Sequence, residues 1–457
     1  MALTASEFDD LARRIHTEVS EARGKRRRAD AGADRPPLDH DDLRQLTLAL
    51  IANSLRDLAK ERLTAGRSVL TPEDEQRLVA AVQAMGGLGW AIEELIADPT
   101  VENIDINGAK VVFVHHSDGT KRRLDRPIAR SDEELERWIR NTAARAGLTE
   151  RRFDEGRPWL ILRLPGGPRL FALMSVTASV CLSIRVHRLD KVTIADLVGE
   201  GMMSEELGDF LTAGVQARLN MIFSGGTNAG KTTCQRAALN ECPEDDRLVT
   251  IEDSYELGMD KMPERHPDVV ALEAREPNAE GLGEITMRQL VKLALRMNPT
   301  RVVVGEVRGD EVLPMLHAMT MGNDGSMCTI HADSADGVFG RIALFAIESP
   351  ERLAPKDVAP LAATALDLII HISYDLVDGP RGRHKARFIS TVLEVTGVSD
   401  DGAGLRTNPV FRPGPEGGAV FCGGLSAPVL ARLAEFGWTP RRPPPATRPA
   451  PAPRRAR

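Results

Sequence analysis

The nine residues "GGTNAGKTT" at 225–233 constrain the fold of this 457-residue chain more than any other stretch. They follow the pattern G-x-x-x-x-G-K-T, the spacing of a phosphate-binding loop, which is specific only between a strand and a helix. The flanks favour both elements: "LNMIFSG" before the loop is a short apolar run that suits a buried strand, and "TTCQRAALNEC" after it can continue as a helix. A chance glycine-rich turn is the alternative, and the agreement of the two flanks argues against it.

A strand that passes through such a loop into a helix directs backbone N–H groups and the positive end of the helix dipole at one point, where a polyphosphate binds. Lys231 adds a compact positive charge for the β and γ phosphates. The hydroxyl of Thr232 is the expected Mg²⁺ ligand. The sequence therefore predicts that ATP and Mg²⁺ bind here. The expected nucleotide-binding residues of the loop are Gly225, Gly226, Thr227, Asn228, Ala229, Gly230, Lys231, Thr232 and Thr233.

Two apolar runs that follow the loop end in acidic residues. The first, "RLVTIEDSYEL", carries Glu252 and Asp253, and the second, "TRVVVGEVRGDE", carries Glu306. Ligands of an open α/β sheet lie beyond the carboxyl ends of its strands, so acids at these positions face the phosphates and their metal. Each acid alone is equally well explained as a capping or surface carboxylate, but two acid-ended strands behind one phosphate-binding loop favour a site.

The spacing of these acids suggests a role for each. Gly305 precedes Glu306 where a usual second nucleotide motif has a metal-binding Asp, so we expect Glu252 and Asp253 to support the Mg²⁺ ion beside the loop threonine. Glu306 is left to polarise the attacking water, with Glu252 as the second candidate for that role. Arg308 lies two residues beyond Glu306 and is a further catalytic candidate.

A histidine ends a third segment, "GNDGSMCTIHADSA" at 322–335. A lone histidine is more often a structural group than a catalyst. His331 follows the strand-like "SMCTI", however, and we expect it to sense the γ-phosphate or to relay its loss.

Composition limits the class of protein. A content of 42% hydrophobic and 27% charged residues is ordinary for a globular protein. No apolar run approaches 18 residues and the N-terminus lacks a signal-type apolar core, so we expect a cytoplasmic protein with neither a membrane span nor an export signal. The five cysteines are scattered without a C-x-x-C pair, which argues against a disulfide framework or a zinc site and favours reduced packing residues.

Charge is distributed unevenly along the chain. The net charge is −7, and the last 19 residues contain six arginines and no acid, so the remainder carries −13. A body this acidic is a poor general binder of nucleic acid, and no specific nucleic-acid partner is expected. The tail is Pro-rich and Arg-rich, which predicts disorder; it is either a solvated tail or a contact for anionic lipid or acidic partners.

Local patterns place several helix boundaries. A helix over 1–22 is expected before a charged linker at 23–37, and Thr71 is the expected cap of a helix that begins with Pro72. The segment before Thr300 should be a helix that Pro299 stops. Its expected apolar stripe consists of Leu290, Leu293, Ala294 and Met297.

Strands and helices alternate around the phosphate-binding loop, which predicts an α/β fold with a doubly wound sheet. The expected fold is a RecA-like P-loop NTPase domain, preceded by a smaller α+β domain and a helical N-terminal module. The expected parts are a helical module with its charged linker at 1–85, an α+β domain at 86–190, the P-loop ATPase domain at 191–400, a C-terminal extension at 401–438 and a disordered tail at 439–457.

The segments "GGTNAGKTT", "TIEDSYEL", "VVVGEVRG" and "GSMCTIHADS", in this order, resemble the Walker A, Asp box, Walker B and His box of the secretion ATPase superfamily (type II/IV secretion). The chain is most similar to the branch of tight-adherence (Tad/Flp) pilus assembly ATPases called CpaF or TadA. "EELIADPTVENIDINGAKVVFV", "LPGGPRLFALMSV" and "LSIRVHR" also resemble that branch. The resemblance covers roughly residues 80–395.

The resemblance implies a homohexameric ring in which each nucleotide lies between the N-domain and the phosphate-loop domain. It also implies that Arg185, Arg163 and Arg169 face the nucleotide. The alternative is that they are surface arginines, which is a stronger alternative for Arg163 and Arg169 than for Arg185. The sequence departs from the superfamily pattern at two positions, which affects the expected relay of γ-phosphate loss through His331. The His box begins with Gly322-Asn323 where a His is common, and Thr300 stands where an Asp is usual.

Two classes of function follow from these observations. The first is a motor that hydrolyses ATP to assemble a pilus, peripheral to the inner membrane, with membrane platform proteins as partners and pilin-type subunits as indirect substrates. A VirB11-like conjugation or type IV secretion ATPase stays open within this class. The second is a nucleotide-binding assembly scaffold that hydrolyses slowly or not at all, against which the full set of site acids argues.

Overall fold

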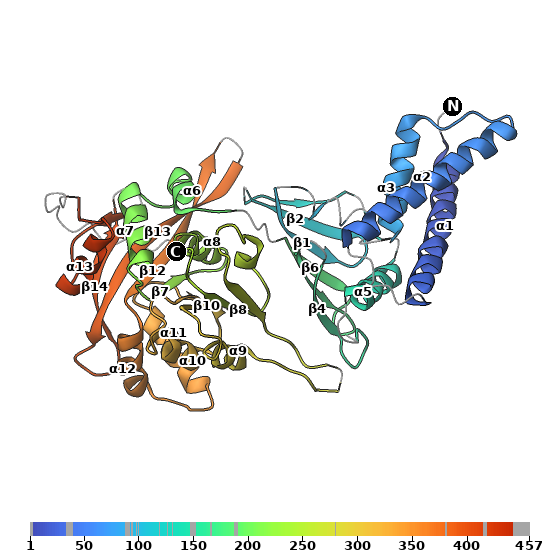
Figure 1. The fold of residues 1–457 in the computed structure, drawn as a ribbon. Helices are drawn as coiled ribbons and strands as arrows, with labels where there is room; N and C mark the ends of the chain where they lie inside the picture. Colours follow the sequence, from blue (N-terminus) through green and yellow to red (C-terminus); the bar gives the residue numbers. More distant parts are fainter. Residues whose placement is uncertain are drawn as a thin grey trace. The chain divides into compact units, whose positions relative to one another are not determined.

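The computed structural model describes residues 3–441 except 33–39, 87–91, 93–94, 97, 99, 118, 126, 130, 147–151, 165–166, 187–190, 279, 380–381 and 415–417. The chain forms two compact units, Met1–Val186 and His187–Arg457 (Figure 1). In the described residues, no helix is both long enough and apolar enough to span a membrane.

The N-terminal unit begins with three helices, α1 (Ala5–Gly32), α2 (His40–Thr64) and α3 (Pro72–Gly86). They pack around a small apolar core that includes Ile15, Ile51 and Leu78. The hydroxyl of Thr71 accepts a 3.1 Å hydrogen bond from the backbone N–H of Asp74, which confirms the predicted cap of α3. The predicted start of the charged linker at residue 23 is wrong, because α1 continues through the basic run to Gly32.

A six-stranded sheet follows in the same unit. Its strands are β1 (Val101–Asn107), β2 (Val111–His116), β3 (Lys121–Arg123), β4 (Trp159–Arg163), β5 (Arg169–Leu173) and β6 (Cys181–Arg185). They pair antiparallel in the order β3-β2-β1-β6-β5-β4. Helix α5 (Asp132–Ala146) packs its apolar side chains into the core formed by alternate residues of these strands.

The C-terminal unit is built on a nine-stranded sheet with the order β15-β14-β13-β12-β7-β11-β10-β8-β9. Strands β7 to β12 are parallel and β13 to β15 extend the sheet antiparallel. The parallel strands are β7 (Met221–Gly225), β8 (Leu248–Glu252), β9 (Val269–Glu273), β10 (Arg301–Val307), β11 (Met327–His331) and β12 (Leu368–Gly379). The antiparallel strands are β13 (Gly382–Val398), β14 (Leu405–Pro413) and β15 (Ala419–Phe421).

Helices cover both faces of this sheet. Strand β7 shows the division, because Phe223 packs into one apolar cluster and its neighbour Ile222 into the other. The first face carries α6 (Ile194–Gly199), α7 (Glu205–Gln216), α8 (Lys231–Leu239) and α13 (Ala427–Glu435). The second carries α9 (Met287–Ala294), α10 (Val312–Met319), α11 (Val338–Glu348) and α12 (Pro355–Ala365). The α/β fold with a doubly wound sheet is therefore present.

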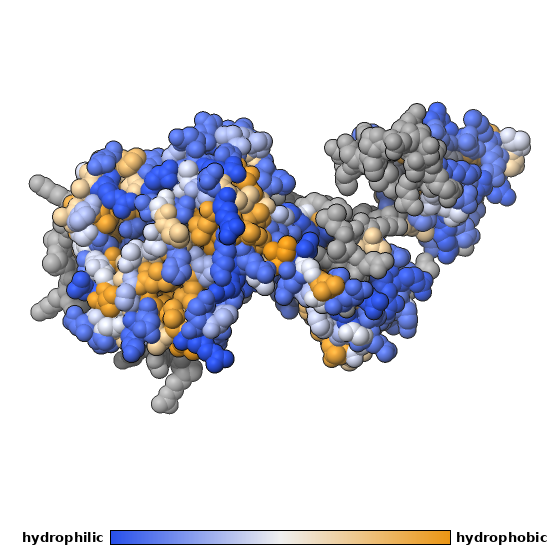
Figure 2. Space-filling view, turned by 60° about the horizontal axis from the view of Figure 1, so that its bottom comes forward, coloured by the Kyte–Doolittle hydropathy of each residue, from blue (hydrophilic) through white to orange (hydrophobic). Residues whose placement is uncertain are grey.

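The second face also has exposed apolar side chains. Figure 2 shows such side chains among polar ones on the C-terminal unit. Leu293 of α9 is 51% exposed, and Leu344 and Ile347 of α11 are also exposed. The apolar stripe predicted for α9 is thus wrong at Leu293: the helix buries Leu290, Val291 and Ala294 instead.

The C-terminal region continues the core of the sheet past residue 400. The ring centroids of Phe411 on β14 and Phe421 on β15 lie 5.5 Å apart in an edge-to-face arrangement. The ring centroid of Trp438 lies 5.1 Å from that of Phe210 on α7. Arg441 pairs with Asp209 of α7 at 2.8 Å, so the start of the predicted tail at residue 439 is wrong. Residues 442–457, on which the rest of that prediction falls, lie outside the described part.

Of the five free cysteines, Cys234, Cys242 and Cys328 are buried and Cys181 is partly buried. Cys422 is exposed, so its expected role as a packing residue is wrong.

Candidate active site

The predicted phosphate-binding loop connects β7 to α8 at the carboxyl edge of the parallel strands. Its first residue must be glycine, because a Cβ atom on Gly225 would lie 2.5 Å from the carbonyl oxygen of Ile372 on β12. Gly230 caps α8 with a φ of 99°, and Asn228 has a φ of 59°. These left-handed residues turn the chain so that the loop enters the helix at its positive end.

Lys231 lies at the start of α8 and is only 7% exposed. Its Nζ donates a 3.0 Å hydrogen bond to the carbonyl oxygen of Gly226 and lies 3.3 Å from both ring nitrogens of His331. The strands explain this contact: β11 runs parallel to β7, with His331 in register with Gly225. The third predicted segment therefore ends beside the loop.

A chain of contacts continues from His331 to the acids. His331 Nε2 lies 2.6 Å from Glu306 Oε1, and Arg308 Nε donates a 2.6 Å hydrogen bond to Glu306 Oε2. Arg308 also lies 3.6 Å from Asp253 Oδ2 at the end of β8. The loop lysine, His331, Glu306, Arg308 and Asp253 thus form one continuous set across three strand ends.

The charge state of His331 follows from its surroundings. Burial lowers the pKa of His331, and the nearby positive charge of Lys231 lowers it further, against the opposing effect of Glu306. A neutral ring accepts from Lys231 through a ring nitrogen, and its Nε2 lies beside Glu306 Oε1, although the two atoms are not aligned for a hydrogen bond. The histidine therefore joins a cation to a carboxylate without adding a charge.

Glu252 lies at the end of β8 but faces inward. It is 3% exposed, and its Oε1 accepts hydrogen bonds from the backbone N–H groups of Glu256 and Leu257 at 2.7 and 2.8 Å. Its Oε2 is buried and has no hydrogen-bond partner among the described residues. Burial raises the pKa of Glu252 to about 7. A Cβ atom on Gly305 would lie 3.0 Å from Glu252 Cγ, which gives a physical reason why a glycine stands before Glu306.

The residues at this edge suit an Mg²⁺ ion that binds together with a nucleotide. They do not suit a metal ion whose ligands all come from the protein. The described residues contain no cluster of three or more His, Cys, Asp and Glu side chains that could hold a metal ion. Mg²⁺ bound with a nucleotide needs only one or two carboxylates, because phosphates and water supply its other ligands. The unpartnered Oε2 of Glu252 is a hard oxygen of this kind, and Asp253 and the half-buried Thr232 lie on the neighbouring segments.

Comparison with known proteins decides the family. A model of the type II/IV secretion system protein family matches residues 89–387, which is more than half of the chain and includes every element of the site described above. The chain belongs to this type II/IV secretion system protein family.

Curated relatives extend this result. A candidate conjugal transfer protein of Mycobacterium tuberculosis is 34% identical over 337 residues, which cover 69% of this chain and 91% of that protein. The type IV secretion system protein VirB11 of Brucella suis biovar 1 is 27% identical over 339 residues, which cover 67% and 90% of the two chains. Among solved structures, the VirB11 ATPase of Brucella suis in complex with sulphate matches with 25% identity and a TM-score of 0.35, covering 66% of this chain and 92% of that chain.

The three N-terminal arginines that the superfamily resemblance singled out form a row on the sheet of the N-terminal unit. Arg169 is directly opposite Arg185 on one side and Arg163 on the other. Residues directly opposite each other on paired strands lie on the same face of a sheet, so the three arginine side chains share one face of that unit.

The two departures from the superfamily pattern lie at the other ends of the strands. Thr300 precedes β10, and its hydroxyl donates to the carbonyl of Arg247 at 3.2 Å. Asn323 precedes β11 and donates to the carbonyl of Ala318 at 3.2 Å. Both positions support loops at the amino ends of their strands, whereas the candidate site of this family member is at the carboxyl ends.

Sequence reasoning missed two residues beside the loop. His371 on β12 is buried, and its Nδ1 lies 2.9 Å from the hydroxyl of Ser224, the residue before the loop. Arg387 on β13 donates from Nε to the carbonyl oxygen of Asn228 at 3.1 Å. A histidine inside the apolar run "LDLIIHIS" was a usable signal for the first, but nothing in the local sequence marks Arg387.

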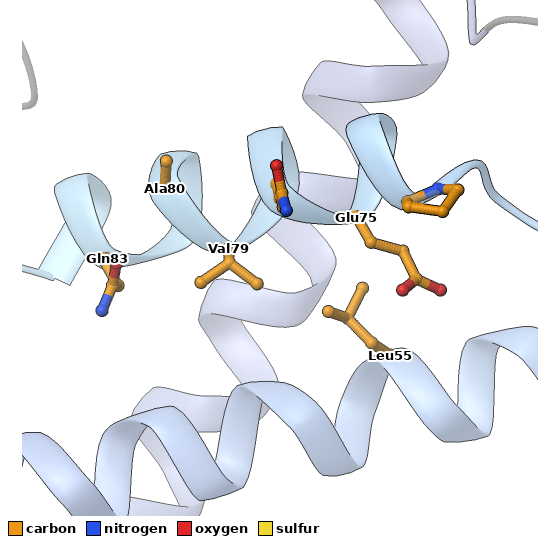
Figure 3. A pocket seen from close by; sticks show the side chains of 7 residues that line it. Leu55, Glu75, Val79, Ala80 and Gln83 are labelled. Atoms are coloured by element: carbon orange, nitrogen blue, oxygen red, sulfur yellow. The ribbon is translucent and has the colours of Figure 1, made fainter.

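The helical part of the N-terminal unit contains a separate hollow of about 380 Å³ between α2 and α3 (Figure 3). Leu55, Val79 and Ala80 line it together with one acid, Glu75. It has no basic side chain among its lining residues and lies before residue 89, outside the matched family region. It is therefore not a candidate for the nucleotide site.

Proposed function

We propose that this family member is an ATPase whose hydrolysis of ATP drives a secretion or pilus-assembly machine. The observation that carries the proposal is the continuous set from Lys231 through His331 to Glu306 at the phosphate-binding loop. A lysine for phosphates and a carboxylate for water, joined by a neutral histidine, form the minimal arrangement for phosphoryl transfer to water.

The residues divide the work as follows. Lys231 and the N–H groups of the loop hold the β and γ phosphates, so that the contacts of Lys231 with Gly226 and His331 are replaced when nucleotide enters. Glu306 orients the attacking water and accepts its proton. His331 contacts Glu306, so a change in the position of the histidine when the γ-phosphate binds changes the surroundings of the carboxylate. Mg²⁺, held by Thr232 and by Glu252 or Asp253, would neutralise charge on the phosphates. Arg308 donates a hydrogen bond to Glu306 and must release this carboxylate for the proton transfer.

We further propose that the active form is a homohexameric ring. The exposed apolar side chains Leu293, Leu344 and Ile347 support this, because a second copy of the chain would remove them from water. The arginine row Arg163, Arg169 and Arg185 would contribute to nucleotide binding in such an assembly.

Two machines are candidates for the one that this motor drives. Tight-adherence pilus assembly by a CpaF/TadA-like motor, with inner-membrane platform proteins as partners at the cytoplasmic side, rests on the motif resemblance. A conjugation or type IV secretion motor is the second candidate, favoured by the names of the conjugal transfer and VirB11 relatives. Deletion of the gene tests the choice: loss of surface pili supports the first, and loss of DNA or effector transfer with intact pili supports the second.

ATP turnover by the purified chain tests the enzymatic proposal. We expect release of phosphate that requires Mg²⁺ and ATP. Binding of ATP without turnover at any protein concentration would instead support a nucleotide-binding assembly scaffold.

A further inference from the structure

The phosphate-binding loop is bordered on its second side by the strand pair β12 and β13. Arg387 of β13 donates from Nε to the carbonyl oxygen of Asn228, at the left-handed turn of the loop. Its Cδ lies 3.4 Å from the position that a Cβ atom on Gly230 would occupy, at the cap of α8. Met202 Cε lies at the same distance from that position, and the backbone carbonyl of Met202 accepts from Ile389 of β13. The arginine is therefore held close to the loop by its own strand.

The strand order gives the direction of a bound nucleotide. The groups proposed for the γ-phosphate, His331 and Glu306, lie on β11 and β10, on one side of β7. The phosphates of a nucleoside triphosphate form a linear chain, so a chain that extends away from these groups places its α-phosphate and nucleoside toward the other side of β7. That side is formed by β12 and β13.

Arg387 is the positively charged residue that the structure places in contact with the loop from this side. Its bond to Asn228 uses one N–H group, and within the described part of the chain the four N–H groups of the two Nη nitrogens have no recorded hydrogen-bond acceptor. A guanidinium presents these groups in a planar fork that matches phosphate oxygens. Gly230, beside which Arg387 lies, begins the helix whose positive end also attracts phosphate.

We propose that Arg387 is a nucleotide-binding residue that contacts the phosphate next to the nucleoside, opposite to the acids. This inference rests on the proposed ATP-binding function of the loop. Because the α-phosphate end is common to ATP and ADP, Arg387 stabilises both complexes to the same extent and takes no part in the hydrolytic step itself.

The test is nucleotide binding and turnover by Arg387→Ala and Arg387→Lys in the full chain. Arg412→Ala is the matched control, since Arg412 is an exposed arginine on β14 of the same sheet. We expect Arg387→Ala to weaken Mg-ADP and a non-hydrolysable Mg-ATP analogue by the same factor, about tenfold, as for loss of one charge-assisted hydrogen bond. The Lys variant should recover part of the affinity, and kcat at saturating ATP should stay within about twofold of wild type.

A purely structural role would change other quantities. If Arg387 only supported the loop, Arg387→Ala would lower kcat and the melting temperature together, and the Lys variant would not recover affinity. That result, or affinities within about twofold of wild type for both nucleotides, would overturn the inference while leaving the ATPase proposal intact. Failure of the wild-type chain to bind either nucleotide would instead overturn the ATPase proposal, and this inference with it.

Discussion

The ammonium nitrogen of Lys231 lies 3.3 Å from both ring nitrogens of His331, and the same ring lies 2.6 Å from Glu306. This relationship links the phosphate-binding loop directly to the carboxylate that we assign to water. A γ-phosphate that attracts Lys231 would remove one of the two contacts of the histidine and leave the other. The geometry thus provides a local route by which nucleotide occupancy reaches Glu306.

Glu306→Gln should keep ATP bound and stop its hydrolysis. The amide preserves the shape of the side chain but cannot accept the proton of water, so we expect kcat to fall at least about 100-fold. Steady-state phosphate release measures this, with the exposed Glu348→Gln as control. Turnover within about threefold of wild type would place the general base elsewhere, and Glu252 would be tested next.

His331→Ala should lower turnover more than nucleotide affinity, because the ring contacts Glu306 through Nε2. We expect a loss of about 10- to 100-fold in kcat and a smaller loss for His331→Gln, whose amide keeps a polar N–H group near the carboxylate. The exposed His317→Ala on α10 is the control. Equal loss in the Ala and Gln variants would contradict a role for a polar group beside Glu306 at this position.

Glu252→Gln should stabilise the nucleotide-free protein at high pH. Burial raises the pKa of Glu252 in the folded state from 4.5 to about 7, so the folded state binds this proton more tightly than the unfolded state. Its contribution to the free energy of unfolding is therefore lost as pH rises from about 4.5 to 7 and stays lost above that. The variant should unfold at a higher temperature than wild type at pH 8, by an amount equivalent to about 3 kcal/mol, and at nearly the same temperature at pH 5.

Thermal unfolding in the presence of a chelator, at pH 5, 6, 7 and 8, measures this difference, and Glu348→Gln again provides the control. A stability difference between Glu252→Gln and wild type that does not vary with pH would show that Glu252 is ionised throughout this range in the folded protein.

Specific ATPase activity should rise with protein concentration if the ring is the active form. The chain before the last 19 residues carries −13, so moderate salt should favour assembly by screening repulsion between subunits. Light scattering with and without a non-hydrolysable ATP analogue, paired with activity over a concentration series, measures both effects. A protein that stays monomeric, with flat specific activity, would contradict the motor proposal and favour the scaffold.

Much of the candidate active site could be predicted from local sequence, because its residues end short apolar strands. The register of β11 with β7 brings His331 beside the loop, and parallel strands carry Glu306 and Asp253 to the same edge. Such edges follow from alternating strands and helices, so the motifs alone predict them. The inward orientation of Glu252 could not be predicted, because it depends on the backbone N–H groups of Glu256 and Leu257 and on the space above Gly305.

The second side of the loop could not be predicted for a different reason. Arg387 reaches Asn228 from a strand 159 residues later in the chain, through antiparallel pairing of β13 with β12. Periodicity detects a strand but not its neighbours. The same limit explains the boundary expected at residue 400, since the aromatic contacts of Phe411 and Trp438 with Phe210 of α7 are long-range.

The central claim is that Lys231 holds the phosphates of ATP, and nucleotide titration of Lys231→Ala tests it most directly. Lys292→Ala, an exposed lysine on α9, is the matched control, and circular dichroism checks that each variant is folded. We predict that wild type and Lys292→Ala bind a non-hydrolysable Mg-ATP analogue alike. Lys231→Ala should bind it at least about 100-fold more weakly with an unchanged spectrum. Wild-type affinity in a natively folded Lys231→Ala protein would contradict the assignment of the loop and, with it, the proposed ATPase.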